Sequence, residues 1–351
     1  MTEKASIAPP GTWWIRLGRG HSVLLPRKTS GVGLALLGVC IALAVVGIGL
    51  GASQYSYADV IQVLQGTGSG PAQLVIVEWR LPRIILAISD GSALGIAGSL
   101  FQAITRNPLG SPDLIGFTMG AQTGILLAVL VFGGTLLSVS ISALVGGLSV
   151  GAVIALLSLR GGFGGFRLIL AGIALSSMLG SLNRWLIVQA DPDTAFGALR
   201  AVTGSLANAD WALAVPCSVG ILLVTLVVLT RSRGLRSFQL GPDIAQALGT
   251  SVNRTQISLL ILGTALVALA TMAAGPIAFV ALIAPHLARL LTQQGGANVF
   301  LSGVVGAALL LSADLIGQTM LDSLPVGVIT GAGGGLYFMG LLLMQSRRRT
   351  R

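Results

Sequence analysis

Charge is scarce in this chain. Charged residues make up 9% of its 351 residues and hydrophobic residues 54%, whereas about a quarter of an ordinary soluble domain is charged. The mean hydropathy is +0.89. This composition excludes a soluble domain of any size and predicts an all-α protein that crosses a membrane many times.

Lysine, cysteine and histidine are also rare. The only lysines are Lys4 and Lys28, so the chain beyond them cannot contain the Gly-x-x-x-x-Gly-Lys-Ser/Thr loop that holds ATP phosphates. We therefore expect a subunit that is not an enzyme and has no ATPase site of its own. Cys40 and Cys217 fall in separate apolar segments, and His286 is the only histidine beyond the N-terminal region. No disulfide framework, metal site or bound cofactor is predicted.

Ten apolar segments approach the ~20 residues that are needed to cross the hydrocarbon core. An even number of spans places both termini on one side of the membrane. We expect a tail at 1–30, a transmembrane domain at 31–345 with its longest loop at 231–254, and a basic tail at 346–351. The predicted spans are 32–52, 84–105, 114–133, 137–157, 167–188, 212–230, 256–274, 276–292, 298–316 and 325–344.

The 21 lysines and arginines are unevenly divided between the two faces of this map. Positive charge concentrates in the cytoplasmic loops of membrane proteins. Only Arg80, Arg83, Arg184 and Arg200 fall on the face opposite the termini. Both termini are therefore predicted to be cytoplasmic, and the net charge of +10 reflects topology.

The segment 80–121 combines an apolar helix with polar chemistry. Arg80 and Arg83 open it, and Asn107-Pro108 break it. A charged group in lipid costs roughly 2.5 to 3.5 kcal/mol, so such groups lie at interfaces, along cavities or against a partner. A proline also frees a backbone carbonyl, which protein or water must satisfy. This pattern predicts part of a transport path.

The loop 231–254 predicts a short helix outside the membrane. Asp243 can cap it, and Ile244, Ala247 and Leu248 would form an apolar stripe on one face. A helix of two turns needs something to pack against. The residues alone leave open whether that is a partner protein or the membrane surface.

Three motifs occur together and in one order. They are RLPR with RNPLGSPDLIGFTMGA within 80–121, GPIAFVALIAPHLARLL at 275–291, and ADLIGQTMLDSLPVGVITGAGGG at 313–335. The chain resembles the FecCD/BtuC family, the permease subunits of ABC importers for ferric siderophores, haem and cobalamin. The likeness covers nearly everything beyond about residue 55. It implies a type II ABC importer permease fold in the cytoplasmic membrane of a prokaryote.

The resemblance also implies partners. These are an ABC ATPase that uses ATP and Mg, a second permease subunit that is identical or different, and an extracytoplasmic substrate-binding protein. Family frequency favours a ferric siderophore as the substrate, with cobalamin and haem as alternatives. An ion-coupled secondary transporter is the other function class, although Asp90, Asp113 and Asp314 have no obvious histidine or lysine partner in the spans.

On the outer face, Arg80 and Arg83 match arginines that receive acidic groups of the binding protein in the family. The alternative to this docking role is that the two arginines extend to lipid headgroups. Gln318 and Ser323 stand where the family usually has arginine and glutamate. The docking electrostatics are therefore expected to be weaker or redistributed, and Arg184 or Arg200 is a candidate to compensate.

The resemblance assigns two further sets of residues. The translocation path and gate are expected at Gln102, Asn107, Pro108, Leu109, Gly162, Gly164 and Gly165. For the glycine-rich segment before the fifth span, a pliable turn without a gating role is an equal alternative. His286 is expected to be a structural hydrogen-bonding residue. The contact with the ATPase is expected at Gly241, Ala245, Ala247, Leu248 and Gly249.

Overall fold

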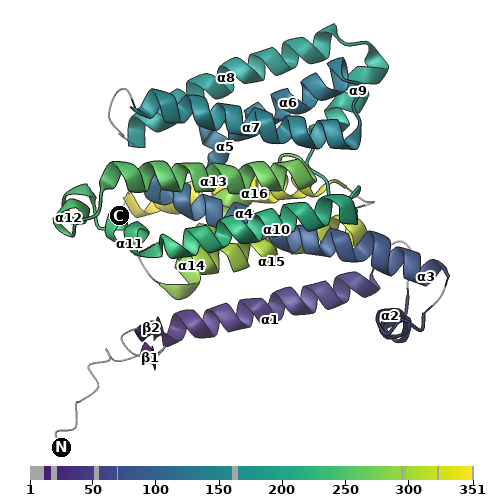
Figure 1. Cartoon of the computed structure of the whole chain (residues 1–351), viewed down its shortest axis with the longest axis horizontal. Helices are drawn as coiled ribbons and strands as arrows, with labels where there is room; N and C mark the ends of the chain where they lie inside the picture. The colour runs from purple at the N-terminus through teal and green to yellow at the C-terminus, as the bar shows by residue number, and fades with distance from the viewer. Residues whose placement is uncertain are drawn as a thin grey trace, which may run out of the picture.

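The computed structural model describes residues 12–16, 22–50, 55–68, 70–159, 165–293, 296, 298–321 and 324–349. Helices dominate these residues (Figure 1). A short antiparallel hairpin of β1 (Thr12–Arg16) and β2 (Ser22–Pro26) precedes the first helix. The expected tail at 1–30 therefore contains two strands, and the first helix already begins at Arg27.

Within the described residues, seven helices are long and apolar enough to cross a membrane, and three shorter apolar helices complete the predicted ten. The predicted all-α polytopic fold is thus confirmed. The long helices are α1 (Arg27–Gly49), α4 (Leu81–Thr105), α7 (Leu136–Leu159), α8 (Gly165–Gln189), α10 (Trp211–Thr230), α13 (Val252–Ala274) and α15 (Val299–Met320). The other three are α6 (Phe117–Val131), α14 (Val280–Thr292) and α16 (Val326–Arg349).

Short helices lie between the spans. They are α2 (Tyr57–Leu64), α3 (Pro71–Gln73), the π-helix η1 (Leu74–Arg80), α5 (Pro112–Ile115), α9 (Pro192–Ala201), α11 (Ser232–Gln239) and α12 (Pro242–Ala247). Figure 1 places α11 and α12 at the same end of the bundle as the start of α1 and the end of α16. The helices α2, α3 and α9 lie at the opposite end. We call these the inner and outer ends, following the predicted orientation.

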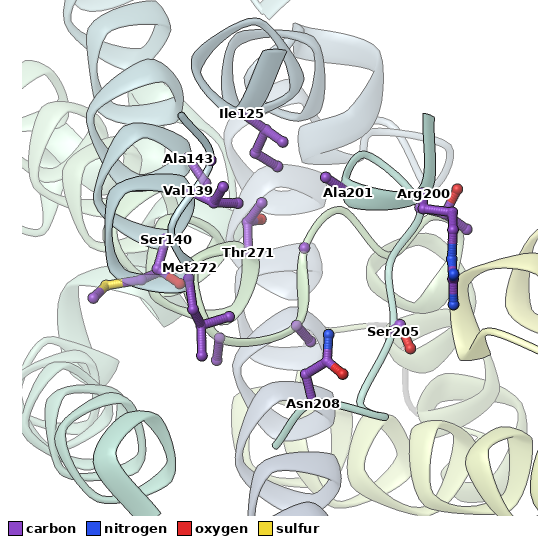
Figure 2. Close-up of a pocket in the computed structure, with 16 residues that line it drawn as sticks. Ile125, Val139, Ser140, Ala143, Arg200, Ala201, Ser205, Asn208, Thr271 and Met272 are labelled. Atoms are coloured by element: carbon purple, nitrogen blue, oxygen red, sulfur yellow. The ribbon is translucent and has the colours of Figure 1, made fainter. Parts of the chain in front are cut away.

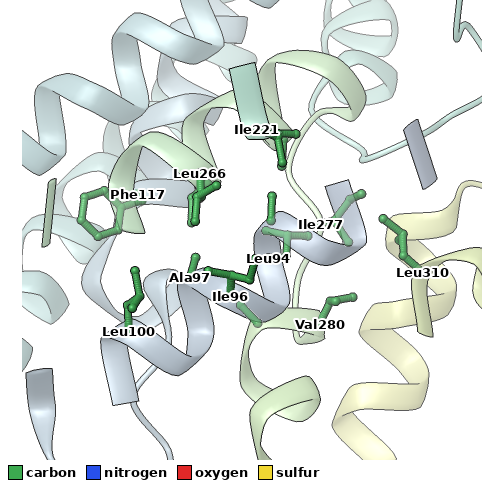
Figure 3. Packing of buried hydrophobic residues seen from close by; sticks show 14 of the residues in the cluster. Leu94, Ile96, Ala97, Leu100, Phe117, Ile221, Leu266, Ile277, Val280 and Leu310 are labelled. Carbon is green, nitrogen blue, oxygen red and sulfur yellow. The ribbon is translucent and has the colours of Figure 1, made fainter. Parts of the chain in front are cut away.

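The helix α4 forms the centre of the bundle, and every residue from Ala93 to its end is buried. It packs against α10, α13, α14 and α15. Figure 3 shows its apolar side chains beside those of its neighbours, such as Leu266 of α13. Glycines bring the backbones close, because a Cβ atom at Gly95 would collide with the carbonyl of Ser302.

Candidate translocation and docking sites

The inner end of α4 is a tight turn. The helix ends at Thr105, and Arg106 has a left-handed φ of 50°. The side-chain oxygen of Asn107 accepts a hydrogen bond from the Leu109 N–H at 2.9 Å, and its carbonyl accepts one from the Gly110 N–H at 2.9 Å. The predicted helix break is confirmed, and the turn itself satisfies part of the freed backbone.

A small groove lies between this turn, α14 and α16. Pro108 and Leu109 form one side of it, and Leu282, His286 and Tyr337 are among the residues that line the rest. The Nδ1 atom of His286 shares a hydrogen bond with the Tyr337 hydroxyl. This bond joins α14 to α16, which fits the structural role expected for His286. In the described part of the chain, no group of three His, Cys, Asp or Glu residues could hold a metal ion.

The other predicted path residues have different surroundings. Gln102 is buried, and its side-chain amide donates to the carbonyl of Leu282 at 3.1 Å. The side chain therefore joins α4 to α14 within one chain. Gly162 and Gly164 lie outside the described residues, and Gly165 opens α8.

Asp113 lies in the short helix α5, in the middle of the bundle. It connects the break between α5 and α6 to the break before α14. Its carboxylate accepts hydrogen bonds from the Thr118 hydroxyl at 2.6 Å and from the backbone N–H of Phe279 at 3.3 Å. Phe279 has a φ of 67°, which is rare for a bulky residue. It caps α14, so this helix starts at Val280 and the predicted start at 276 is wrong. The preceding backbone is not helical, although it is apolar. A Cβ atom at Gly334 would collide with Phe279, so α16 passes directly against this strained residue.

Arg80 faces into the chain at the outer end. Its side chain is buried, and Nη1 donates to the carbonyl of Ile48 at 2.5 Å. The guanidinium group also lies 5.6 Å from the centre of the Tyr55 ring. A buried charge needs such partners. This position differs from the expected exposed docking charge, because Arg80 holds η1 against the end of α1.

Arg83 is bound to Asp314 of α15. Its Nη2 and Nε atoms lie 2.8 and 2.9 Å from the two carboxylate oxygens, a fork geometry typical of strong ion pairs. The amide of Gln318 donates to the same carboxylate at 2.7 Å. Only 20% of the Arg83 side chain and 2% of the Asp314 side chain are exposed. The charge of Arg83 is thus balanced within the chain.

The short helix α12 stands at the inner end of the bundle (Figure 1). Gly241 and Gly249 bracket it with φ values of 109° and 77°, which L side chains rarely adopt. The helix begins at Pro242, with Gly241 as its N-cap. Asp243 therefore lies in the first turn, and the prediction that it caps the helix is wrong.

One face of α12 is apolar and exposed. Ile244 is 50% exposed and Leu248 61% exposed, and Ala247 is exposed beside them. The predicted stripe is therefore present and is available to a partner. Ala245 is fully buried, so its role is to seat the helix on the bundle.

Sequence reasoning missed two features of these sites. One is the Asp113–Phe279 contact, and the other is the bond from Gln318 to Asp314. The second had a signal, since Gln318 follows Asp314 by one helical turn and such pairs face each other. The left-handed φ of Phe279 could not have been predicted, because phenylalanine rarely adopts this conformation.

Comparison with curated proteins shows similarity over most of the chain. The ferric enterobactin transport system permease protein FepG of Escherichia coli (strain K12) is 39% identical over 318 residues, which cover 90% of this chain and 96% of FepG. The probable siderophore transport system permease protein YfhA of Bacillus subtilis (strain 168) is 36% identical over 329 residues, covering 90% and 95%. The achromobactin transport system permease protein CbrC of Dickeya dadantii (strain 3937) is 34% identical over 339 residues, covering 94% and 96%.

A solved structure has the same fold. It is described as an inward-facing conformation of a metal-chelate type ABC transporter, and it matches with a TM-score of 0.77 and 29% identity over 90% of this chain and 99% of its own. The model of the FecCD transport family matches residues 37–344. The chain, a multi-pass membrane protein, therefore belongs to the FecCD transport family.

Proposed function

We propose that this chain is a permease subunit of an ATP-driven importer of ferric siderophores. The similarity to the permeases for ferric enterobactin and achromobactin supports this substrate class. The partners would be a second permease subunit, an ABC ATPase that uses ATP and Mg, and an extracytoplasmic binding protein. The chelated iron is the substrate that passes, and the chain would lie in a prokaryotic cytoplasmic membrane with both termini inside.

The exposed apolar face of α12 is the observation that carries this proposal. Ile244 and Leu248 lie at the inner end, outside the spans, where apolar side chains mark an interaction surface. Both lysines precede residue 30, so the spans and their loops have no P-loop. The energy must then come through a partner or an ion gradient. The helix α12 is held on the bundle by a buried alanine and exposes an apolar stripe. This arrangement favours a partner protein over an ion gradient as the energy source.

Three sites complete the proposal. The turn from Asn107 to Leu109 would form the inner gate, beside the groove with α14 and α16. Helix α12 would couple the gate to the ATPase. On the outer face, Arg83 would mark the docking region for the binding protein, with its charge modulated by Asp314.

Reconstitution in liposomes tests the proposal. Vesicles that contain both permeases and the ATPase are supplied with loaded binding protein outside, and uptake of a radiolabelled ferric siderophore is measured. Uptake should require internal ATP, the ATPase and the binding protein, and should exceed uptake of haem or cobalamin. Accumulation by vesicles that hold this chain alone, driven by an imposed proton or sodium gradient, would instead establish a secondary transporter.

A further inference from the structure

A cavity of about 320 Å³ lies at the outer end of the bundle, between the ends of α6, α9 and α13 and the start of α7. In Figure 2, Ile125, Val139 and Ala143 lie on one side of it, and Ser205 and Asn208 lie across from them. Its volume falls in the range of cavities that hold small ligands. The α4 turn, α12 and Arg83 do not line it, so the proposed import function leaves this cavity unassigned.

The cavity carries one positive charge without a counter-charge. Arg200, in the last turn of α9, lies at its edge and is exposed. No acidic residue lines the cavity. Throughout the described ranges, the side chains of Arg200, Asn208 and Ser140 have no hydrogen bond or ion pair, although Ser140 is buried. These donors suit an anion with several oxygen atoms.

The cavity continues into an apolar surface. Leu136 lines the cavity and is also exposed at the start of α7. The exposed residues Leu137, Ile141, Val145 and Leu148 follow along the same helix at intervals of three or four residues. Residues at this spacing share one helix face. An apolar track therefore runs down this span towards the middle of the membrane, on the helix face next to the one that lines the cavity.

We propose that this cavity binds the headgroup of an anionic phospholipid. Its phosphate would contact Arg200 and Asn208, and one acyl chain would follow the exposed track on α7. A positive pocket at the end of membrane helices, with an exposed apolar helix face beside it, matches both parts of such a lipid. A zwitterionic lipid fits less well, because its cationic group would lie near Arg200. The bound lipid would join the outer ends of α7 and α9.

Native mass spectrometry of the purified importer assembly tests this proposal. The assembly is taken from nanodiscs of phosphatidylcholine that contain increasing fractions of phosphatidylglycerol, and retained phosphatidylglycerol is counted. Loss of a charge-assisted hydrogen bond in Arg200→Gln should weaken retention about tenfold. Arg184→Gln is the matched control, because Arg184 is another exposed outer arginine and does not line the cavity. Ser140→Leu, which fills the cavity, should also lose the lipid.

Equal retention by the wild type and Arg200→Gln would overturn the proposal. Equal losses in Arg200→Gln and Arg184→Gln would also overturn it, because they would indicate a general surface charge effect. If Arg200→Gln keeps the lipid but binds the binding protein more weakly, the cavity receives an acidic side chain of that protein instead. The lipid count does not depend on transport, so its failure leaves the proposed import function untouched.

Discussion

Asp314 is the residue on which the outer half of α4 and α15 depends. It accepts hydrogen bonds from Arg83 and Gln318 while nearly all of its side chain is buried. Breaking a buried ion pair from one side leaves an uncompensated charge and costs about 3 kcal/mol or more. Asp314→Ala should therefore lower the thermal unfolding temperature of the purified assembly clearly. Gln318→Ala removes one bond and should cost only about 1 kcal/mol.

The double variant Arg83→Met with Asp314→Leu is the control for this prediction. Replacement of both charges by apolar groups removes the unpaired charge, so part of the lost stability should return. An Asp314→Ala protein as stable as the wild type would show that water, not the ion pair, satisfies Arg83.

These bonds also show where single residues exceed what a sequence can predict. Arg83 and Asp314 are separated by 231 positions, and Asp113 and Phe279 by 166. Residue type predicted that Arg83 lies at the start of its helix, because charge avoids the hydrocarbon core, and Arg83 does lie in the first turn of α4. It could not show that the guanidinium group is already bound to a carboxylate of the same chain.

At the scale of helices, close packing of α4 depends on glycine at chosen positions. A Cβ atom at Gly95 would collide with the Ser302 carbonyl of α15, whereas one at Gly38 of α1 would meet no atom within 4 Å. Gly95→Ala should force α4 and α15 apart and destabilise the protein by about 1–3 kcal/mol. Gly38→Ala should be neutral or stabilising by up to about 1 kcal/mol, because alanine favours the helix. The thermal unfolding temperature should therefore fall clearly in Gly95→Ala and stay unchanged or rise in Gly38→Ala.

The element α12 yields a prediction on coupling. Ala247→Glu places a charge on the exposed apolar face and should uncouple ATP hydrolysis from uptake, with at least about a tenfold loss of transport, because the charge would lose its water in the interface. Gln246→Glu is the matched control, since Gln246 is exposed but lies off the stripe. Both variants should insert and assemble normally. Substrate-stimulated hydrolysis and uptake that persist in Ala247→Glu would show that α12 does not contact the ATPase.

Hydropathy predicted the number and order of the spans well but not their ends. Each predicted span contains an apolar helix, because apolar backbone in a membrane has little alternative to a helix, but among the described residues only seven are long enough to cross and three are shorter. The errors lie at helix ends that are set by the backbone conformation and not by hydropathy. The start of α14 is displaced by Phe279. The apolar helix that contains α4 extends outward to Pro71, although the predicted span began at 84.

At the scale of the whole molecule, α4 connects the two faces that transport must coordinate. Its outer end carries the Arg83–Asp314 pair, and its inner end forms the turn beside α14 and α16. Asp113 lies between them and joins the break after α4 to the strained start of α14. A shift of α14 or α16 would therefore change the surroundings of the inner turn. The similar solved structure is inward-facing, and an importer must also adopt a state in which this side is closed.

The inner turn should accordingly change its exposure to water during the transport cycle. Cysteines placed at Asn107 and Leu109, in a background without Cys40 and Cys217, should react with a water-soluble thiol reagent applied from the cytoplasmic side. Both native cysteines are buried, so their replacement by alanine should leave the fold intact. Labelling should change at least about threefold when the ATPase is trapped with nucleotide, a modest shift in population. Ser99→Cys, fully buried on α4, is the control that should stay unreactive in both states. If the cysteines at the turn never react, or react identically in all states, the turn is a packed kink and the inner gate lies elsewhere.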